Sequence, residues 1–389
     1  MSVLLALLIG IISATSTVDI VSNGLGSSGS AIVPEQGASA QLPPPQQPHP
    51  PPPPPLRYIP KFQTTPLATY EARLIDHDLQ IALGGGGHGL TAETATISSD
   101  SLQRILVGVE NGKKESYYFF GLLKLYGISL PKDVEVAAQY FRKASDHGHA
   151  EGATAAGVMY LTGVGVQKDY AMAIALFRRG VGLGDTNALW LLGKTLIEIA
   201  SSPDIDQVMR AWSAGATPDV PVGRTPHEEA ARLLTLAAAD NIPQAFHYLG
   251  ILHEYGLGVP RDAERARMLY TRAAEERYIE SMYHLALMQA FGRGGAIDYR
   301  AALALFEAGG RADHAPSSYY MGVFKTYGYG CEPDYAEAVN WFEKAAALDD
   351  YRVSVKASAA ATELTTLLSE ADTYNNELIE LMKARSDSR

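Results

Sequence analysis

The sequence predicts an all-α fold: a right-handed α-solenoid of about six helix-turn-helix repeats, with a half-repeat at its start and a helical cap at its end. A small anchor residue recurs six times, and four of the five intervals between its copies are 36 residues. The remaining interval is 57 residues, so one copy carries 21 extra residues. A fixed period of this size is typical of solenoids, in which each repeat packs against its neighbours. The anchor stands at Gly121, Gly157, Gly193, Gly250, Ala286 and Gly322.

Three further columns of the repeat have side chains of nearly constant size. A small residue stands five places before the anchor, alanine stands sixteen places after it, and a large apolar residue stands twenty places after it. We expect the small residues to let the two helices of one repeat approach closely, and the large residues to fill the gap between repeats. The small column is Ser116, Gly152, Ala188, Ala245, Ser281 and Ser317, and the large column is Phe141, Phe177, Leu234, Tyr270, Phe306 and Phe342.

A glycine-rich turn and a capping residue separate the two helices of most copies. Gly163, Gly256 and Gly328 are expected to adopt the positive φ angles that end the first helix. A polar residue then precedes the second helix, where its side chain can accept hydrogen bonds from free backbone N–H groups. Metal or phosphate binding is the alternative, but one carboxylate per repeat is too sparse for it. The capping residues are Asp133, Asp169, Thr225, Asp262, Asp298 and Asp334.

This combination of columns and turns resembles the Sel-1-like repeat family, a relative of the tetratricopeptide repeats. The copy from Ala150 to Asp185 carries the family pattern at nearly every position, and the resemblance extends over residues 101–350. Ser129 and Ala286 depart from the pattern, since the family has glycine at both places. The resemblance implies an α-solenoid that holds other proteins and has no catalytic activity.

Three segments precede the repeats. Residues 1–16 contain an apolar run followed by small residues, which is typical of a signal peptide and too short for a membrane span. No Lys or Arg precedes the run, so an apolar start without a targeting role is the alternative. Residues 17–65 are rich in Gly and Ser and then in Pro, which predicts a disordered spacer. Residues 66–100 combine a helix with a glycine-rich linker that lacks the lysine of a phosphate-binding loop.

Two regions depart from the regular repeat. The extra residues fall between Ile197 and Arg224, where Asp204–Trp212 could form a short helix; contact with a partner and drift in a tolerant loop both stay open. Residues 351–389 lack the glycine turn, and we expect two helices there, Val353–Leu368 and Glu377–Ala384, as a terminal cap.

Composition narrows the classes of function. The net charge of −11 argues against a nucleic-acid partner. The lone Cys331 cannot form a disulfide framework, and no segment after residue 16 is apolar enough for a direct membrane span. His147 and His149 form a pair without a third metal ligand, and no nucleophile elbow of the Gly-x-Ser-x-Gly kind occurs. We therefore expect no enzyme, no metal and no cofactor.

The first helices offer candidate protein-binding residues. The positions three and two places before the anchor point away from the small column, and five copies carry aromatic side chains there. In the family these helices line the concave face, so the side chains could form a groove for a peptide or partner loop. Packing against the neighbouring first helix is the alternative. The candidates are Tyr118, Phe119, Trp190, His247, Tyr248, Tyr283, His284, Tyr319 and Tyr320.

The leading functional hypothesis is a non-catalytic scaffold in the secretory pathway, in the lumen of the endoplasmic reticulum. Secretory members of the family resemble the lumenal adaptor of the membrane ubiquitin ligase in endoplasmic-reticulum-associated degradation. The resemblance implies that ligase and misfolded client proteins as partners. The alternative is a cytoplasmic or bacterial-type signalling adaptor of the same family, and a hydrolase on a repeat scaffold is a weaker third class.

Overall fold

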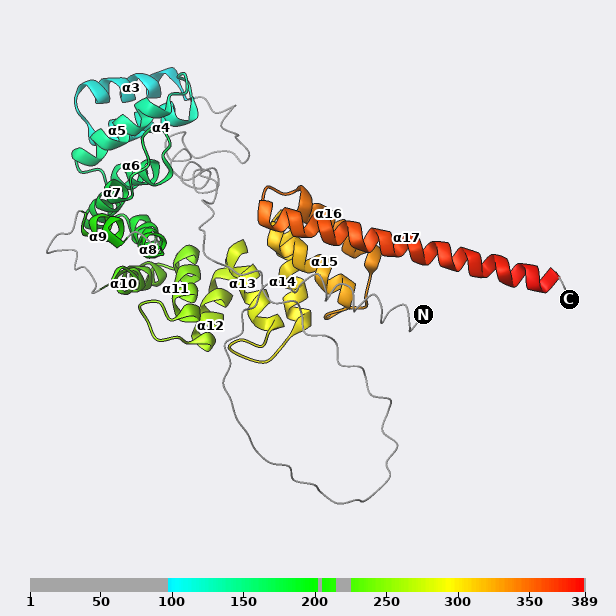
Figure 1. Cartoon of the computed structure of the whole chain (residues 1–389). Coiled ribbons are helices and arrows are strands. Elements are labelled where there is room, and N and C mark those ends of the chain that lie inside the picture. Colours follow the sequence, from blue (N-terminus) through cyan, green and yellow to red (C-terminus); the bar gives the residue numbers. More distant parts are fainter. Residues whose placement is uncertain (1–96, 202–204, 215–224, 388–389) are drawn as a thin grey trace, which may run out of the picture. The chain divides into compact units, whose positions relative to one another are not determined.

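The structure is a computed structural model of the chain, and it describes residues 97–201, 205–214 and 225–387. These residues form α-helices joined by short turns, with no strand among them (Figure 1). They fall into two compact units, one that ends at Ile297 and one that begins at Asp298. The predicted signal peptide, the Pro-rich segment and nearly all of residues 66–100 lie outside the described residues.

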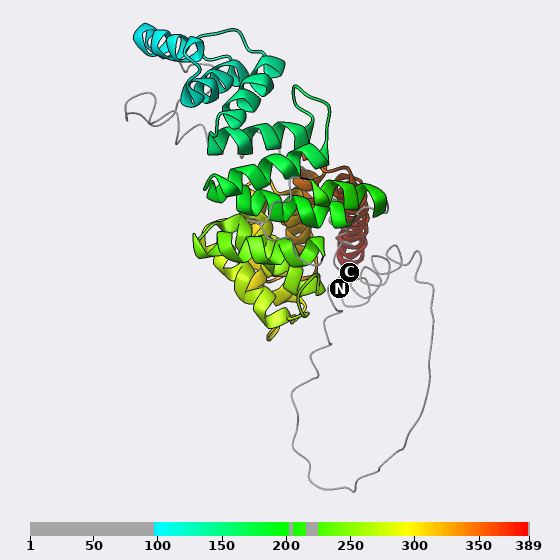
Figure 2. The same ribbon diagram turned by 90° about the vertical axis from the view of Figure 1, so that its left-hand side faces the viewer.

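The first unit consists of helix pairs, each of which packs against the next (Figures 1 and 2). The pairs are α4 with α5, α6 with α7, α8 with α10, and α11 with α12; α3 packs on α4 at the place of the expected half-repeat. The bounds are α3 Ser99–Glu110, α4 Lys114–Tyr126, α5 Val134–Asp146, α6 Ala150–Thr162, α7 Tyr170–Gly182, α8 Thr186–Ala200, α9 Ile205–Ser213, α10 Pro226–Ala239, α11 Pro243–Tyr255, α12 Ala263–Glu275 and α13 Ile279–Ala290.

The second unit contains α14 (Tyr299–Arg311), α15 (Ala315–Tyr327), α16 (Tyr335–Ala347) and α17 (Tyr351–Asp387). Each of the first three packs against the next, and α17 packs on α16 and, over a smaller area, on α15. One continuous helix of 37 residues thus replaces the two terminal helices that the sequence predicts. Its sequence holds neither Gly nor Pro, so nothing breaks the helix at the polar stretch between the two apolar segments.

The predicted helix caps are confirmed. In α12, for example, Asp262 has extended backbone angles and its carboxylate accepts a hydrogen bond from the Arg265 N–H at 2.9 Å. Asp133, Asp169, Asp298, Asp334 and Thr225 cap α5, α7, α14, α16 and α10 in the same way. At the other end, Gly127, Gly163, Gly256 and Gly328 adopt left-handed angles as the C-caps of α4, α6, α11 and α15.

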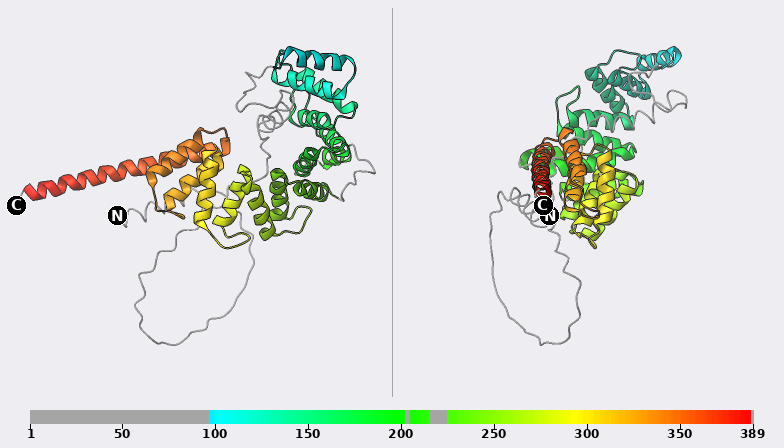
Figure 3. Two further views of the ribbon diagram at one scale, coloured as in Figure 1. Left: turned by 180° about the vertical axis from the view of Figure 1, so that it is seen from behind. Right: turned by 90° about the vertical axis from the view of Figure 1, so that its right-hand side faces the viewer.

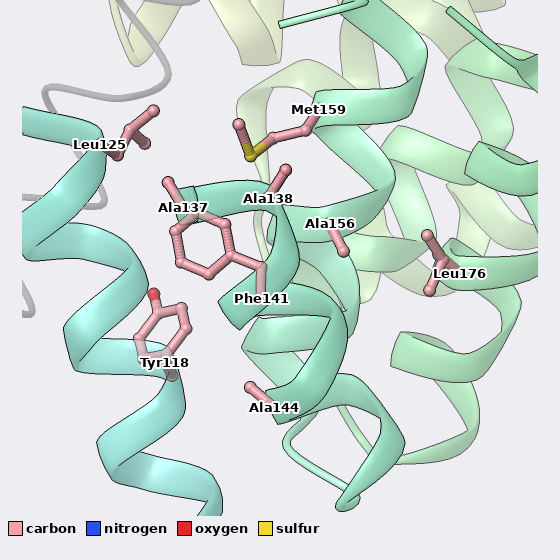
Figure 4. Packing of buried hydrophobic residues seen from close by; sticks show 9 residues of the cluster. All are labelled: Tyr118, Leu125, Ala137, Ala138, Phe141, Ala144, Ala156, Met159 and Leu176. Atoms are coloured by element: carbon pink, nitrogen blue, oxygen red, sulfur yellow. The ribbon is translucent and has the colours of Figure 1, made fainter. Parts of the chain in front are cut away.

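The large and the small residues of the repeat make other contacts than the sequence predicts. The large residue covers the anchor glycine of its own repeat: a Cβ atom added to Gly157 would lie 2.6 Å from Cε1 of Phe177. The close approach of small residues occurs instead between repeats, since a Cβ on Gly152 of α6 would lie 2.7 Å from Ala144 Cβ of α5. Figure 4 shows the large residue of the first repeat, Phe141, among apolar side chains of both its own repeat and the next. The anchor glycine is therefore small because the large residue of its own repeat lies on it.

The departure at Ser129 also has a structural reason. In later repeats the second turn glycine touches the start of the preceding second helix; a Cβ on Gly165 would lie 2.2 Å from the carbonyl oxygen of Val134. Ser129 keeps a positive φ, of 55°. Its hydroxyl accepts a hydrogen bond from the Ile97 N–H at 3.1 Å, just before α3. The serine thus joins the half-repeat to the first full repeat.

Candidate protein-binding surface

The nine aromatic candidates lie on the first helices of the repeats, where the sequence places them, but most of their surface is covered. Phe119 of α4 and Tyr319 of α15 are half-buried. The other seven side chains are at most 7% exposed: Tyr118, Trp190, His247, Tyr248, Tyr283, His284 and Tyr320.

Ring contacts between helices explain this burial. Trp190 of α8 stacks on Tyr248 of α11, the next first helix, with ring centroids 6.5 Å apart and planes at 9°. Tyr118 stacks on His149 at 4.6 Å. These side chains therefore pack against neighbouring helices, which was one of the two alternatives; the other was an open groove. A role in binding stays a prediction, and Phe119 and Tyr319 are the candidates with free surface for it.

The insertion forms a second candidate site. Its helix α9 confirms the short helix that the sequence suggests at Asp204–Trp212, and it packs on α7 and α8. Beneath it lies a buried ion pair: Arg178 of α7 donates from Nη2 to both carboxylate oxygens of Glu229 of α10, at 2.9 and 3.1 Å. The two residues are 2% and 0% exposed. The pair is therefore shielded from water and competing ions.

Both charges of this pair also hold the inserted helix. The Nη1 atom of Arg178 donates to the carbonyl oxygens of Trp212 and Ala214, each at 2.6 Å, at the C-terminal end of α9. The indole N–H of Trp212 donates to Glu229 Oε2 at 2.6 Å. A cation is favourable at a helix C-terminus, and a buried ion pair needs such additional hydrogen bonds. The three side chains therefore fix α9 against the repeat; we name them the insertion clamp.

Neither the sequence nor the repeat pattern identifies the insertion clamp. Arg142 stands one repeat earlier at the same place as Arg178, and its side chain is 41% exposed. The signal that the sequence offers is Trp212, an aromatic residue inside the insertion.

Comparison with known proteins gives the family of the repeats. The model of the Sel1 repeat matches residues 114–149, 150–185, 243–278, 279–314 and 315–350. The chain carries five Sel1 repeats. The resemblance drawn from the sequence is thereby confirmed, and Sel1 repeats serve as scaffolds for protein–protein interaction. No curated protein matches the chain.

Two solved structures are similar to the chain. A Sel1 repeat protein from Oxalobacter formigenes is 21% identical, with a TM-score of 0.53 over 63% of this chain and 90% of its own. A protective antigen of uropathogenic Escherichia coli with an SLR fold is 20% identical, with a TM-score of 0.44 over 72% of this chain and 64% of its own. The first of these likenesses supports the predicted all-α solenoid class.

A sixth helix pair lies between the second and third matched Sel1 repeats. Its helices α8 and α10 pack together although α9 interrupts them, and a Cβ on Gly193 would lie 2.7 Å from Cγ of Leu234. This is the anchor contact of the matched repeats. The insertion clamp thus sits inside a repeat that keeps the Sel1 geometry.

A second buried polar network joins two Sel1 repeats of the first unit. Glu254 Oε2 accepts a hydrogen bond from the Tyr270 hydroxyl at 2.8 Å and lies 3.6 Å from His284 Nδ1, while Arg293 pairs with Oε1. Burial alone would raise the pKa of Glu254, but His284 and Arg293 hold it below the ordinary value. Glu254 and His284 are 4% and 3% exposed, so this network positions helices rather than a substrate.

The histidine pair at the end of α5 serves the helix ends. His147 Nδ1 lies 2.8 Å from the Lys143 carbonyl oxygen, and His149 Nδ1 accepts from the Gly152 N–H at 3.1 Å as the N-cap of α6. Within the described ranges, no group of three or more His, Cys, Asp or Glu residues could hold a metal ion. Among the helices that the structure describes, none has both the length and the apolar character to cross a membrane.

Proposed function

We propose that the chain is a non-catalytic protein-interaction scaffold that works as an adaptor in the secretory pathway, within a ubiquitin-ligase complex of endoplasmic-reticulum-associated degradation. The observation that carries the scaffold role is the series of Sel1 repeats, which present successive helix pairs instead of one enclosed pocket. The buried charges of the insertion clamp are used in packing between helices. A membrane ubiquitin ligase and misfolded client proteins are the proposed partners.

The secretory part of the proposal is supported by the sequence before the repeats. The apolar run in residues 1–16 has the length of a signal-peptide core, and a Gly/Ser- and Pro-rich spacer follows it. The proposed location is the lumen of the endoplasmic reticulum, with residues 1–16 removed.

A glycosylation reporter tests this location. The chain has no Asn-x-Ser/Thr acceptor, and Lys113→Thr creates one at Asn111, an exposed residue between α3 and α4. Lys113 is the N-cap of α4 and makes no capping bond, so threonine suits the position. In eukaryotic cells we expect the variant to gain an endoglycosidase-sensitive glycan, while Lys113→Ala gains none. An unglycosylated Lys113→Thr protein with Met1 intact would exclude the lumenal adaptor.

A cytoplasmic or bacterial-type Sel1 signalling adaptor is the second candidate. It is favoured by the lack of any Lys or Arg before the apolar run, since signal peptides have a positive start. In that case the reporter variant stays unmodified, and partners are recovered with the cytoplasmic fraction.

A further inference from the structure

The last helix has a covered side and an uncovered side. Val353, Ala357 and Leu364 are at most 2% exposed, and the first two pack with Ala315 of α15 and Ala345 of α16. Figures 1 and 3 show α17 lying along α16 and then running past it. With about 100° of rotation per residue, a second set of side chains lies on the opposite side of the helix. All of them are exposed, and we name them the outer face of α17: Tyr351, Val355, Ser358, Ala359, Thr362, Thr366, Ser369 and Thr373.

The outer face has large side chains at one end and small ones along the rest. Tyr351 is 83% and Val355 is 54% exposed, so the described residues leave much of their surface uncovered. The other residues are Ala, Ser and Thr, and Ser and Thr are weaker helix formers than the Lys, Glu and Arg typical of exposed helix surfaces. The small side chains leave a shallow hollow of about 640 Å³, lined by Ser354, Val355, Ser358, Ala359, Thr362 and Glu363. This shape suits a second helix that crosses α17 closely.

One edge of the outer face carries four charges in a fixed order. Arg352 and Lys356 lie in the first half of this edge, and Glu363 and Glu370 lie in the second half. The four residues fall within about 40° of one another around the helix axis. None of them makes an ion pair with any residue that the structure describes. The edge is therefore basic at one end and acidic at the other, and its charges are free to pair.

We propose that the outer face of α17 binds the outer face of α17 in a second copy of the chain, with the two helices antiparallel. A two-fold axis that relates antiparallel helices brings the same edge of both helices together, so that one patch binds itself. Arg352 of each copy then meets Glu370 of the other copy, and Lys356 meets Glu363. If the helices cross near residue 360, both pairs are level to within about half a helical turn.

The side chains of the face fit the same arrangement. Tyr351 of one copy lies opposite Ser369 of the other, so a large side chain meets a small one. A parallel pair fits less well, because it brings the charged edge against the other edge of the face, where Asp372 is the one charged residue among those described. The inference goes beyond the proposed function, since α17 lies outside the matched Sel1 repeats.

Sedimentation equilibrium of the full chain tests the proposal. We expect a monomer–dimer equilibrium whose dissociation constant rises as salt is added, because exposed charge pairs are screened. Tyr351→Ala should raise the dissociation constant about tenfold, as the loss of an aromatic anchor does at an interface. The helix content measured by circular dichroism should stay the same, since most of the Tyr351 side chain is exposed within its own unit.

Two charge variants test the antiparallel arrangement. Arg352→Glu with Lys356→Glu makes the whole edge acidic, and Glu363→Lys with Glu370→Lys makes the whole edge basic. Each variant alone should dimerise at least about tenfold more weakly, because like charges would then meet. An equal mixture of the two should regain the dimer, because each acidic edge then meets a basic edge.

A control variant separates these contacts from the effect of net charge. Arg265→Glu with Arg300→Glu makes the same change in net charge as the acidic variant, on exposed residues of α12 and α14, and should leave the dimer as it is. The proposal is overturned if the unchanged chain stays monomeric, if the edge variants dimerise as well as the control does, or if their mixture stays monomeric.

Discussion

The indole N–H of Trp212 donates a hydrogen bond to Glu229 Oε2 at 2.6 Å, and this bond ties the inserted helix α9 to the second helix of the repeat that it interrupts. Because Arg178 of the preceding repeat pairs with the same carboxylate, the insertion closes a contact between two repeats. Insertions in solenoids often meet partners. Here the inserted helix is also fixed to two repeats by hydrogen bonds.

Breaking the insertion clamp should therefore destabilise the fold. Arg178→Met leaves the Glu229 carboxylate buried without its cation, and we expect the free energy of unfolding in urea to fall by about 3–5 kcal/mol. Replacing both partners, Arg178→Met with Glu229→Met, should cost less than the two single changes together, since no lone charge remains buried. Arg179→Met is the control, because the Arg179 side chain is 44% exposed. If Arg178→Met and Arg179→Met lowered the free energy of unfolding equally, the stabilising role of the insertion clamp would be contradicted.

The anchor glycines should be intolerant of a single added carbon. Gly157→Ala places a Cβ atom 2.6 Å from the Phe177 ring, so we expect a loss of about 1–3 kcal/mol in the free energy of unfolding. Gly182→Ala at the end of α7 is the matched control, because a Cβ there meets no atom within 4 Å. A stabilising Gly157→Ala would mean that the ring moves aside freely.

Stability should fall in mild acid through His247. Its Nδ1 lies 2.9 Å from Ser281 Oγ, and burial, together with His284 at 5.4 Å between ring centroids, lowers the pKa of His247 well below its ordinary value of 6.5. The unfolded chain therefore binds a proton at His247 more readily than the folded chain does. The contribution of neutral His247 to the free energy of unfolding is fully present above about pH 6.5, and it is lost as the pH falls towards the folded-state pKa of His247.

Each pH unit within that window should remove up to about 1.4 kcal/mol of the free energy of unfolding. His247→Phe, which restores the aromatic type of the neighbouring repeats, should flatten the pH dependence measured by urea unfolding between pH 7 and about pH 5. His147→Phe changes an exposed histidine and should leave the slope as it is. An unchanged slope in His247→Phe would assign the acid sensitivity to other groups.

The aromatic candidates should separate into two classes when they are made polar. Tyr248→Ser and Tyr320→Ser remove buried rings and should lower the free energy of unfolding by about 2–5 kcal/mol. Phe119→Ser and Tyr319→Ser should cost less and weaken capture of native partners by about 1–3 kcal/mol if the first helices bind proteins. Melting curves and affinity capture with mass spectrometry distinguish the classes. If Phe119→Ser and Tyr319→Ser both captured native partners as well as the unchanged chain does, the binding surface would lie elsewhere.

Features that depend on a few neighbouring residues could be predicted from the sequence. The Asp262 cap and the left-handed Gly256 each involve contacts within one helix end, so the local residue types determine them. The repeat period added the pairing of helices, since every copy must bury the same face. Even α17 follows local rules, because its uninterrupted helix could have been inferred from the absence of Gly and Pro.

Burial was decided by contacts between residues far apart in the chain. Arg142 and Arg178 hold the same place in successive repeats, yet one is 41% exposed in its side chain and the other 1%. The difference comes from α9 and from Glu229, which stands 51 residues after Arg178. In the same way, the aromatic positions fit a groove or a packed seam equally well until the stacking of Trp190 on Tyr248 joins two repeats. Side-chain type and helix period alone determine which face a residue occupies, whereas only the folded neighbours determine whether that face meets water.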